Sequence, residues 1–156
     1  MRSRIEIDVD APAQAVFELA RDVTRWPQLL PHYRKVTVLS HDGEATIATM
    51  RAVRPVGPLG IPVAWRSRVW SDARDPKDLR LRFVHVRGAT RGMDVTWHIK
   101  PRDGGCRVAI EHDFSRPLPL LGADVFPALI DSLFIRPIAG RTLATFKRLA
   151  ESGEKQ

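Results

Sequence analysis

The chain has 156 residues, 44% hydrophobic and 28% charged, and 25 Lys and Arg against 18 Asp and Glu give it a formal net charge of +7. This length fits one domain with a sizeable core, and the apolar content excludes a chain that is disordered over most of its length. One cysteine excludes an internal disulfide and any site built from several thiolates. We expect a single domain over residues 1–152, followed by a polar tail at 153–156.

The N-terminal residues do not read as a targeting segment. Arg2, Arg4, Glu6 and Asp8 interrupt the window in which a secretory signal needs an apolar stretch. No segment reaches the ~18 consecutive apolar residues of a membrane span. The sequence therefore predicts a cytoplasmic protein without a transmembrane segment.

The positive charge raises the question of a nucleic-acid partner. Twenty of the 25 basic residues are Arg, and they are spread along the chain with acids among them. A nucleic-acid footprint concentrates its cations on one helix or loop. The pattern favours a solvated Arg-rich surface and no DNA partner, with association with RNA or the ribosome as the alternative.

The first third of the chain predicts one strand and two helices. Residues 4–9 alternate charged and apolar side chains, as in a half-buried strand. An apolar stripe at helical spacing then predicts a helix from Pro12 to about Arg21, which Asp10 can cap. A short helix follows Thr24 and ends at Pro31.

The middle of the chain predicts six strands between residues 33 and 114. Turn signals separate them at 42–43, 55–62, 75–78, 88–92 and 103–105. Loops this short join antiparallel neighbours. A long helix is then expected over about 124–151, bent or weakened at Pro137 and Gly140.

These elements predict an α+β architecture. A seven-stranded antiparallel sheet can bury its concave face only under another element, and the long C-terminal helix is the only one large enough. A sheet curled around this helix leaves a space beside the two short helices. We expect an internal ligand cavity there.

Several segments resemble one known superfamily. They read IDVDAPAQAVF at 7–17, DVTRWP at 22–27, GMDVTW at 92–97 and DF at 113–114, and the chain at 137–146 is similar too. They resemble the helix-grip fold of the START/Bet v1-like superfamily, in its polyketide cyclase and coenzyme Q-binding branch. The resemblance implies a domain that is an aromatase/cyclase, a carrier of lipids or quinones, or a ribosome-associated protein.

The resemblance also implies cavity residues. Aromatase/cyclases of this superfamily use Trp side chains, a Tyr and an Arg, and Trp26, Tyr33 and Trp97 are similar to these Trp and Tyr residues. The Arg is open. On the strand at 62–72, a phase with Trp65 inward leaves Arg66 and Arg68 outside, whereas a phase with Trp70 inward brings both in, and a bulge could reconcile the two.

The alternation along two strands predicts that two histidines face the cavity. His112 alternates with Val108, Ile110 and Phe114, and His85 shares a face with Leu79, Leu81 and Phe83. An unperturbed imidazole has a pKa near 6.5, which suits removal of a proton next to a ketone. A structural, hydrogen-bonded His is the alternative at both positions. His98 has the opposite phase and is expected to face solvent.

The leading hypothesis is a cavity that binds a hydrophobic small molecule, such as a lipid, quinone or polyketide. The alternative is a polyketide aromatase/cyclase with Tyr33, Arg66, Arg68 and His112 as catalytic residues. No phosphate-binding, nucleophile or zinc motif occurs, so no metal or cofactor is expected. The protein is expected to be a monomer or homodimer. The side chains predicted to contact the ligand are Trp26, Trp65, Trp70, His85, Met93, Trp97, Phe114 and Leu133.

Overall fold

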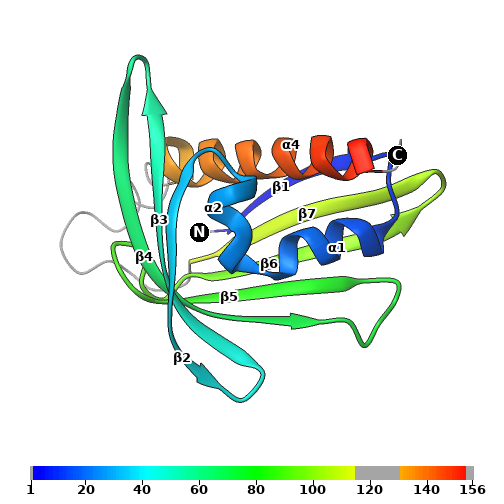
Figure 1. Cartoon of the computed structure of the whole chain (residues 1–156), viewed down its shortest axis with the longest axis horizontal. Helices are drawn as coiled ribbons and strands as arrows, with labels where there is room; N and C mark the ends of the chain where they lie inside the picture. The colour runs from blue at the N-terminus through cyan, green and yellow to red at the C-terminus, as the bar shows by residue number, and fades with distance from the viewer. Residues whose placement is uncertain (1, 115–130, 154–156) are drawn as a thin grey trace.

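Seven antiparallel strands form a curled sheet, and a C-terminal helix lies across its concave face (Figure 1). The computed structural model describes residues 2–114 and 131–153. The strands follow the order β1-β7-β6-β5-β4-β3-β2. This arrangement confirms the predicted α+β helix-grip fold. The strands are β1 (Arg2–Val9), β2 (Tyr33–Asp42), β3 (Ala45–Val56), β4 (Leu59–Asp72), β5 (Leu79–Arg87), β6 (Asp94–Arg102) and β7 (Gly105–Asp113).

The two helices after β1 were predicted at the observed places. Helix α1 (Ala13–Arg21) buries its apolar stripe, and a 3-10 turn η1 (Val23–Arg25) leads into the short helix α2 (Trp26–Leu29). Asp10 does not cap α1, because its N-cap position is held by Pro12. The indole Nε1 of Trp26 donates to the Ala20 carbonyl at 3.0 Å and ties α2 to the end of α1.

The C-terminal helix α4 (Arg136–Gly153) covers the sheet, and its last turns are tied to the junction of β1 and α1. The Lys147 ammonium donates to the Asp8 carbonyl at 2.7 Å and pairs with Glu151. Glu151 also accepts from the Asp10 backbone N–H at 2.9 Å. These contacts fix the end of α4 that lies far from η2.

The start of the helix differs from the prediction. The described part begins with a π-helical turn η2 (Asp131–Ile135), and residues 124–130 of the predicted helix lie outside the described residues. Pro137 is the second residue of α4 and follows η2 almost directly, so its missing N–H interrupts the helical hydrogen bonds where the π-helical turn meets α4. No helix among the described ranges is long and apolar enough to cross a membrane.

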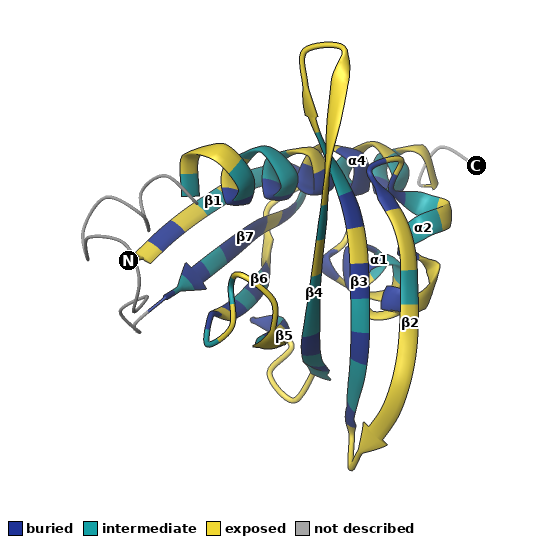
Figure 2. Cartoon of the chain, turned by 90° about the vertical axis from the view of Figure 1, so that its left-hand side faces the viewer, coloured by how far each residue is buried: buried dark blue, intermediate teal, exposed yellow. Residues whose placement is uncertain are grey.

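The predicted loop at 55–62 is wrong, since β3 and β4 continue through it as a tight hairpin. Val56 pairs with Leu59, and Gly57 in the turn has φ +56°, a conformation that glycine adopts without strain. Pairing of β3 to β2 ends at Ala52, and pairing of β4 to β5 begins at Arg66. The hairpin tip is therefore two-stranded and exposed (Figure 2), which tolerates prolines that cannot donate to a neighbour.

Candidate ligand cavity

A cavity of about 470 Å³ lies between the concave face of the sheet, α2 and the start of α4. Its size falls within the range of small-molecule sites. Its mouth is edged by the tip of the β3–β4 hairpin, the β5–β6 turn and η2. Among the described residues that line it, none is Arg, Lys, Asp or Glu. The aromatic lining residues are Trp26, Tyr33, Trp65, Phe83, Trp97 and Phe134, and the polar ones are His85, Thr90, His112 and Thr142.

Trp26 is the centre of the aromatic wall. Its ring lies 5.0 Å from Tyr33 in an edge-to-face arrangement, 5.7 Å from Phe83 and 5.8 Å from Trp97, measured between centroids. Helix α2 brings Trp26 over the sheet, strands β2, β5 and β6 supply these three rings, and Phe146 of α4 is a fourth partner at 5.9 Å. The indole is 2% exposed, so it packs the core and also presents one side to the cavity.

The structure settles the phase of β4. Trp65 lines the cavity and stacks on His85 at 5.9 Å, while Ser67 and Val69 are buried on the same face. A register shift in the β4–β5 pairing lies between Arg66 and Ser67 but does not turn β4 over. The phase with Trp70 inward is therefore wrong.

Arg66, Arg68 and Trp70 lie on the outer face, which corrects their expected place in the cavity. Arg68 donates to Asp42 at 2.9 Å, and its guanidinium lies 5.0 Å from the centroid of Trp70. Arg82 approaches the same ring at 5.3 Å. Trp70 thus makes cation–π contacts with two arginines, which offset the cost of placing an indole on the outside of the sheet.

Of the other residues predicted to contact the ligand, some line the cavity and some do not. Met93 lines the cavity, together with Trp26, Trp65, His85 and Trp97. Phe114 and Leu133 are not among the lining residues, because Phe114 is packed in the core and Leu133 is 37% exposed. The inward alternation along β7 thus carries Phe114 past the end of the cavity.

His85 and His112 both face the cavity as strand phase predicted. Burial lowers the pKa of His85 to about 3, with a further contribution from the neighbouring His112. Burial also lowers the pKa of His112 to about 4, with Asp131 opposing this effect and Arg136 adding to it. His85 Nδ1 lies 2.6 Å from the Thr90 hydroxyl, whereas His112 Nδ1 has no hydrogen-bond partner among the described residues. Both imidazoles are neutral at physiological pH.

A polar chain behind Tyr33 was not predicted from the sequence. The Thr142 hydroxyl donates to the Ile138 carbonyl at 2.9 Å, so it accepts from Nε2–H of His32, which lies 2.8 Å away. Burial raises the pKa of Tyr33, and a hydrogen bond with Thr142 opposes this rise. Tyr33 is therefore a neutral phenol in the cavity wall. His32 and Thr142 are 110 residues apart, and no local pattern connects them.

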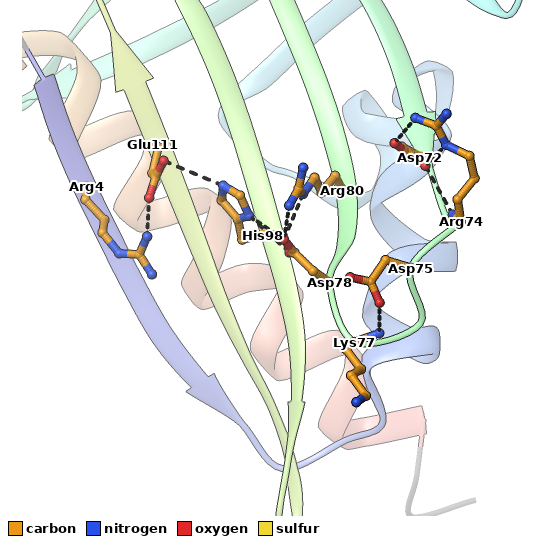
Figure 3. A network of polar contacts seen from close by, with 9 residues as sticks. All are labelled: Arg4, Asp72, Arg74, Asp75, Lys77, Asp78, Arg80, His98 and Glu111. Carbon is orange, nitrogen blue, oxygen red and sulfur yellow. Dashed lines mark hydrogen bonds and ion pairs between the residues drawn. The ribbon is translucent and has the colours of Figure 1, made fainter.

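His98 lies on the outer face, within an ion network rather than open to solvent (Figure 3). Its Nδ1 lies 3.0 Å from Asp78, its Nε2 lies 3.6 Å from Glu111, and its side chain is only 16% exposed. Arg80 pairs with Asp78, and Arg4 pairs with Glu111. The sheet separates this network from the cavity, so His98 takes no part in the site.

Two proteins with sequences similar to this chain both have names that refer to polyketide cyclisation. A protein of Streptomyces cyaneus whose name assigns it to the polyketide cyclases is 30% identical over 110 residues, which cover 70% of each chain. The granaticin polyketide synthase bifunctional cyclase/dehydratase of Streptomyces violaceoruber is 29% identical over 157 residues. That alignment covers 97% of this chain but 44% of the relative, so the chain spans less than half of that protein's length.

Solved structures share the fold. The Zhui aromatase/cyclase from Streptomyces sp. R1128 superposes with a TM-score of 0.73 at 20% identity, over 97% of this chain and 93% of that one. A STAR-related lipid transfer protein from Xanthomonas axonopodis gives a TM-score of 0.65 at 14% identity, over 95% and 85%. The sequence profile described as "Polyketide cyclase / dehydrase and lipid transport" matches residues 9–133. The chain therefore belongs to the polyketide cyclase / dehydrase and lipid transport family.

Proposed function

We propose that this protein binds a largely apolar, ring-containing small molecule of the polyketide type in its internal cavity. The observation that carries the proposal is the cavity of about 470 Å³, whose wall combines three tryptophans with a few neutral polar groups. Apolar walls supply affinity by burying the guest, and isolated hydrogen-bonding groups orient it. The names of the two curated relatives support the polyketide class.

Filling the cavity tests this proposal. Ala139 on α4 lines the cavity, whereas Ala144 on the same helix is exposed. The variant Ala139→Phe is expected to weaken binding of the neutral fluorescent probe N-phenylnaphthylamine by about tenfold or more, because a benzyl group occupies the space of the guest. Ala144→Phe is the matched control and should bind like the wild type.

Fluorescence titration measures the affinity of each variant for the probe, and thermal unfolding shows whether the variant is folded. Equal affinities in the wild type and a folded Ala139→Phe would place the probe elsewhere. Failure of the wild type to bind this probe or any polycyclic ketone below millimolar concentration would reject the proposal.

A second candidate function is cyclisation and dehydration of a poly-ketone chain, favoured by His112 in the cavity wall, whose Nδ1 has no hydrogen-bond partner within residues 2–114 and 131–153. In this scheme the neutral His112 accepts a proton from the carbon between two ketones, and the Tyr33 phenol donates a hydrogen bond to the carbonyl oxygen that gains charge. The enolate carbon attacks a second carbonyl carbon of the same chain. This bond closes the ring, and the resulting alkoxide takes the proton back from His112. Loss of the new hydroxyl together with a proton from the adjacent carbon, as water, then leaves a carbon–carbon double bond in the ring.

This candidate makes a kinetic prediction. We expect His112→Gln to lower turnover of a poly-ketone thioester analogue about 100-fold and Tyr33→Phe about tenfold, with the affinity for N-phenylnaphthylamine nearly unchanged. Arg66→Ala is the control, since Arg66 lies on the outer face, and it should leave turnover unchanged. Product formation is followed by chromatography. Wild-type turnover in His112→Gln would refute the assignment of the base.

A further inference from the structure

Arg54 is the one arginine of β3 whose side chain lies on the cavity side of the sheet. Ala48, Met50 and Ala52 are buried on that face, and the alternation continues to Arg54 without a shift in the β3–β4 register. Arg54 pairs across the hairpin with Ile61, which lines the cavity mouth. The β3–β4 hairpin, which was predicted to be a loop from residue 55 onward, therefore places the guanidinium group of Arg54 at the mouth.

The side chain of Arg54 is only partly satisfied. Its Nε is buried and has no hydrogen-bond partner among the described residues. By contrast, Arg136 on the other side of the mouth donates its Nε to Asp131 at 2.7 Å. A buried donor without an acceptor is costly, and the cost is greater when the group is charged.

An aromatic ring holds the guanidinium in place. The Cζ of Arg54 lies 5.4 Å from the centroid of Phe134, and Phe134 lines the cavity from η2. Stacking on an aromatic face orients a guanidinium but uses none of its in-plane N–H donors. Arg54 is thus positioned at the mouth with a buried Nε–H that has no acceptor within the described part of the chain.

We propose that Arg54 binds the anionic end of the cavity's guest, so that the guest is an apolar ring system carrying a carboxylate or a similar oxyanion. This rests on the proposed binding function and adds the class of head group. A planar guanidinium matches the two oxygens of a carboxylate, and such charge-assisted hydrogen bonds are among the strong ones. The cavity wall itself offers no cation among its described residues, so an acidic group entering with an apolar body finds its partner at Arg54.

A matched pair of probes separates this proposal from the binding function. Anilinonaphthalenesulfonate and N-phenylnaphthylamine share one ring skeleton, and only the first carries an oxyanion. Arg54→Gln is expected to weaken binding of the sulfonate by about tenfold or more, with the neutral probe changed by less than about twofold. Arg54→Lys keeps the charge without the planar fork and should give an intermediate loss.

Arg51→Gln is the control for net charge. Arg51 is exposed on the opposite face of the same strand, so its loss lowers the overall charge equally without touching the mouth. It should leave the affinity ratio of the two probes unchanged. An unchanged ratio in Arg54→Gln, or an equal drop in Arg51→Gln, would overturn the role of Arg54. Binding of neither probe to the wild type would instead reject the cavity function itself.

Discussion

Lowering the pH from 7 to 5 is expected to reduce the free energy of unfolding by several kcal/mol, because the buried histidines are neutral. Burial lowers the pKa of His85 to about 3 and of His112 to about 4, whereas unfolding returns both to about 6.5. Between those values the unfolded state binds more protons than the folded state. Each histidine therefore lowers the free energy of unfolding by about 1.4 kcal/mol for every unit by which the pH is lowered. At pH 5 the two together cost about 4 kcal/mol, and His32, whose pKa burial also lowers to about 4, adds to this cost.

Urea unfolding at pH 7 and pH 5 measures this effect. The double variant His85→Gln/His112→Gln should lose much of the acid sensitivity, whereas His41→Gln, at an exposed position, should keep it. Carboxylates with lowered pKa values, such as Asp78 beside Arg80 and His98, add to acid sensitivity only below the unfolded value of about 3.8. A wild type equally stable at both pH values would show that the two imidazoles are not buried as described.

Trp26→Ala is expected to cost about 3–5 kcal/mol of stability, the usual range for removing a large buried aromatic side chain. The substitution removes ring contacts to Tyr33, Phe83 and Trp97 and the hydrogen bond to the Ala20 carbonyl. It also widens a cavity that the ring borders, so the surrounding side chains cannot collapse fully onto the vacated space.

Trp70→Ala is the matched control, since it removes the same side chain from the outer face of the sheet. Its contacts to Arg68 and Arg82 are cation–π contacts on the outer surface, so the expected loss is about 1 kcal/mol or less. Urea unfolding of both variants at pH 7 gives the comparison. Similar losses for the two would contradict the inward and outward assignment of these tryptophans.

Local alternation was enough to predict much of the fold and part of the site. The phases of β5 and β7 placed His85 and His112 toward the interior, and Trp26, which was predicted to contact the ligand, lines the cavity. These predictions succeed because each residue lies among apolar neighbours at a spacing of two or in a short helix, and burial of one face then fixes the direction of its side chain.

The phase of β4 could not be predicted because both faces of this strand carry a tryptophan. Ser67 stands in the middle of the buried face, while Trp70 stands outside. On the outer face Trp70 contacts two arginines, and one of them comes from β5, so the surroundings of Trp70 cannot be read from the alternation within β4. Arg54 was missed for a related reason, since three prolines and two glycines at 55–62 suggested a loop where the structure has an exposed hairpin.

The fastening of α4 has a mechanical consequence. Lys147 and Glu151 form hydrogen bonds that join the C-terminal turns of α4 to the β1–α1 junction, and Thr142, near the middle of α4, accepts a hydrogen bond from His32. The turns before Thr142, from Phe134 to Ala139, form part of the cavity wall. These polar contacts therefore tie the second half of α4 to the domain, whereas the turns at the entrance are held by apolar packing, for example of Ile135 and Ala139.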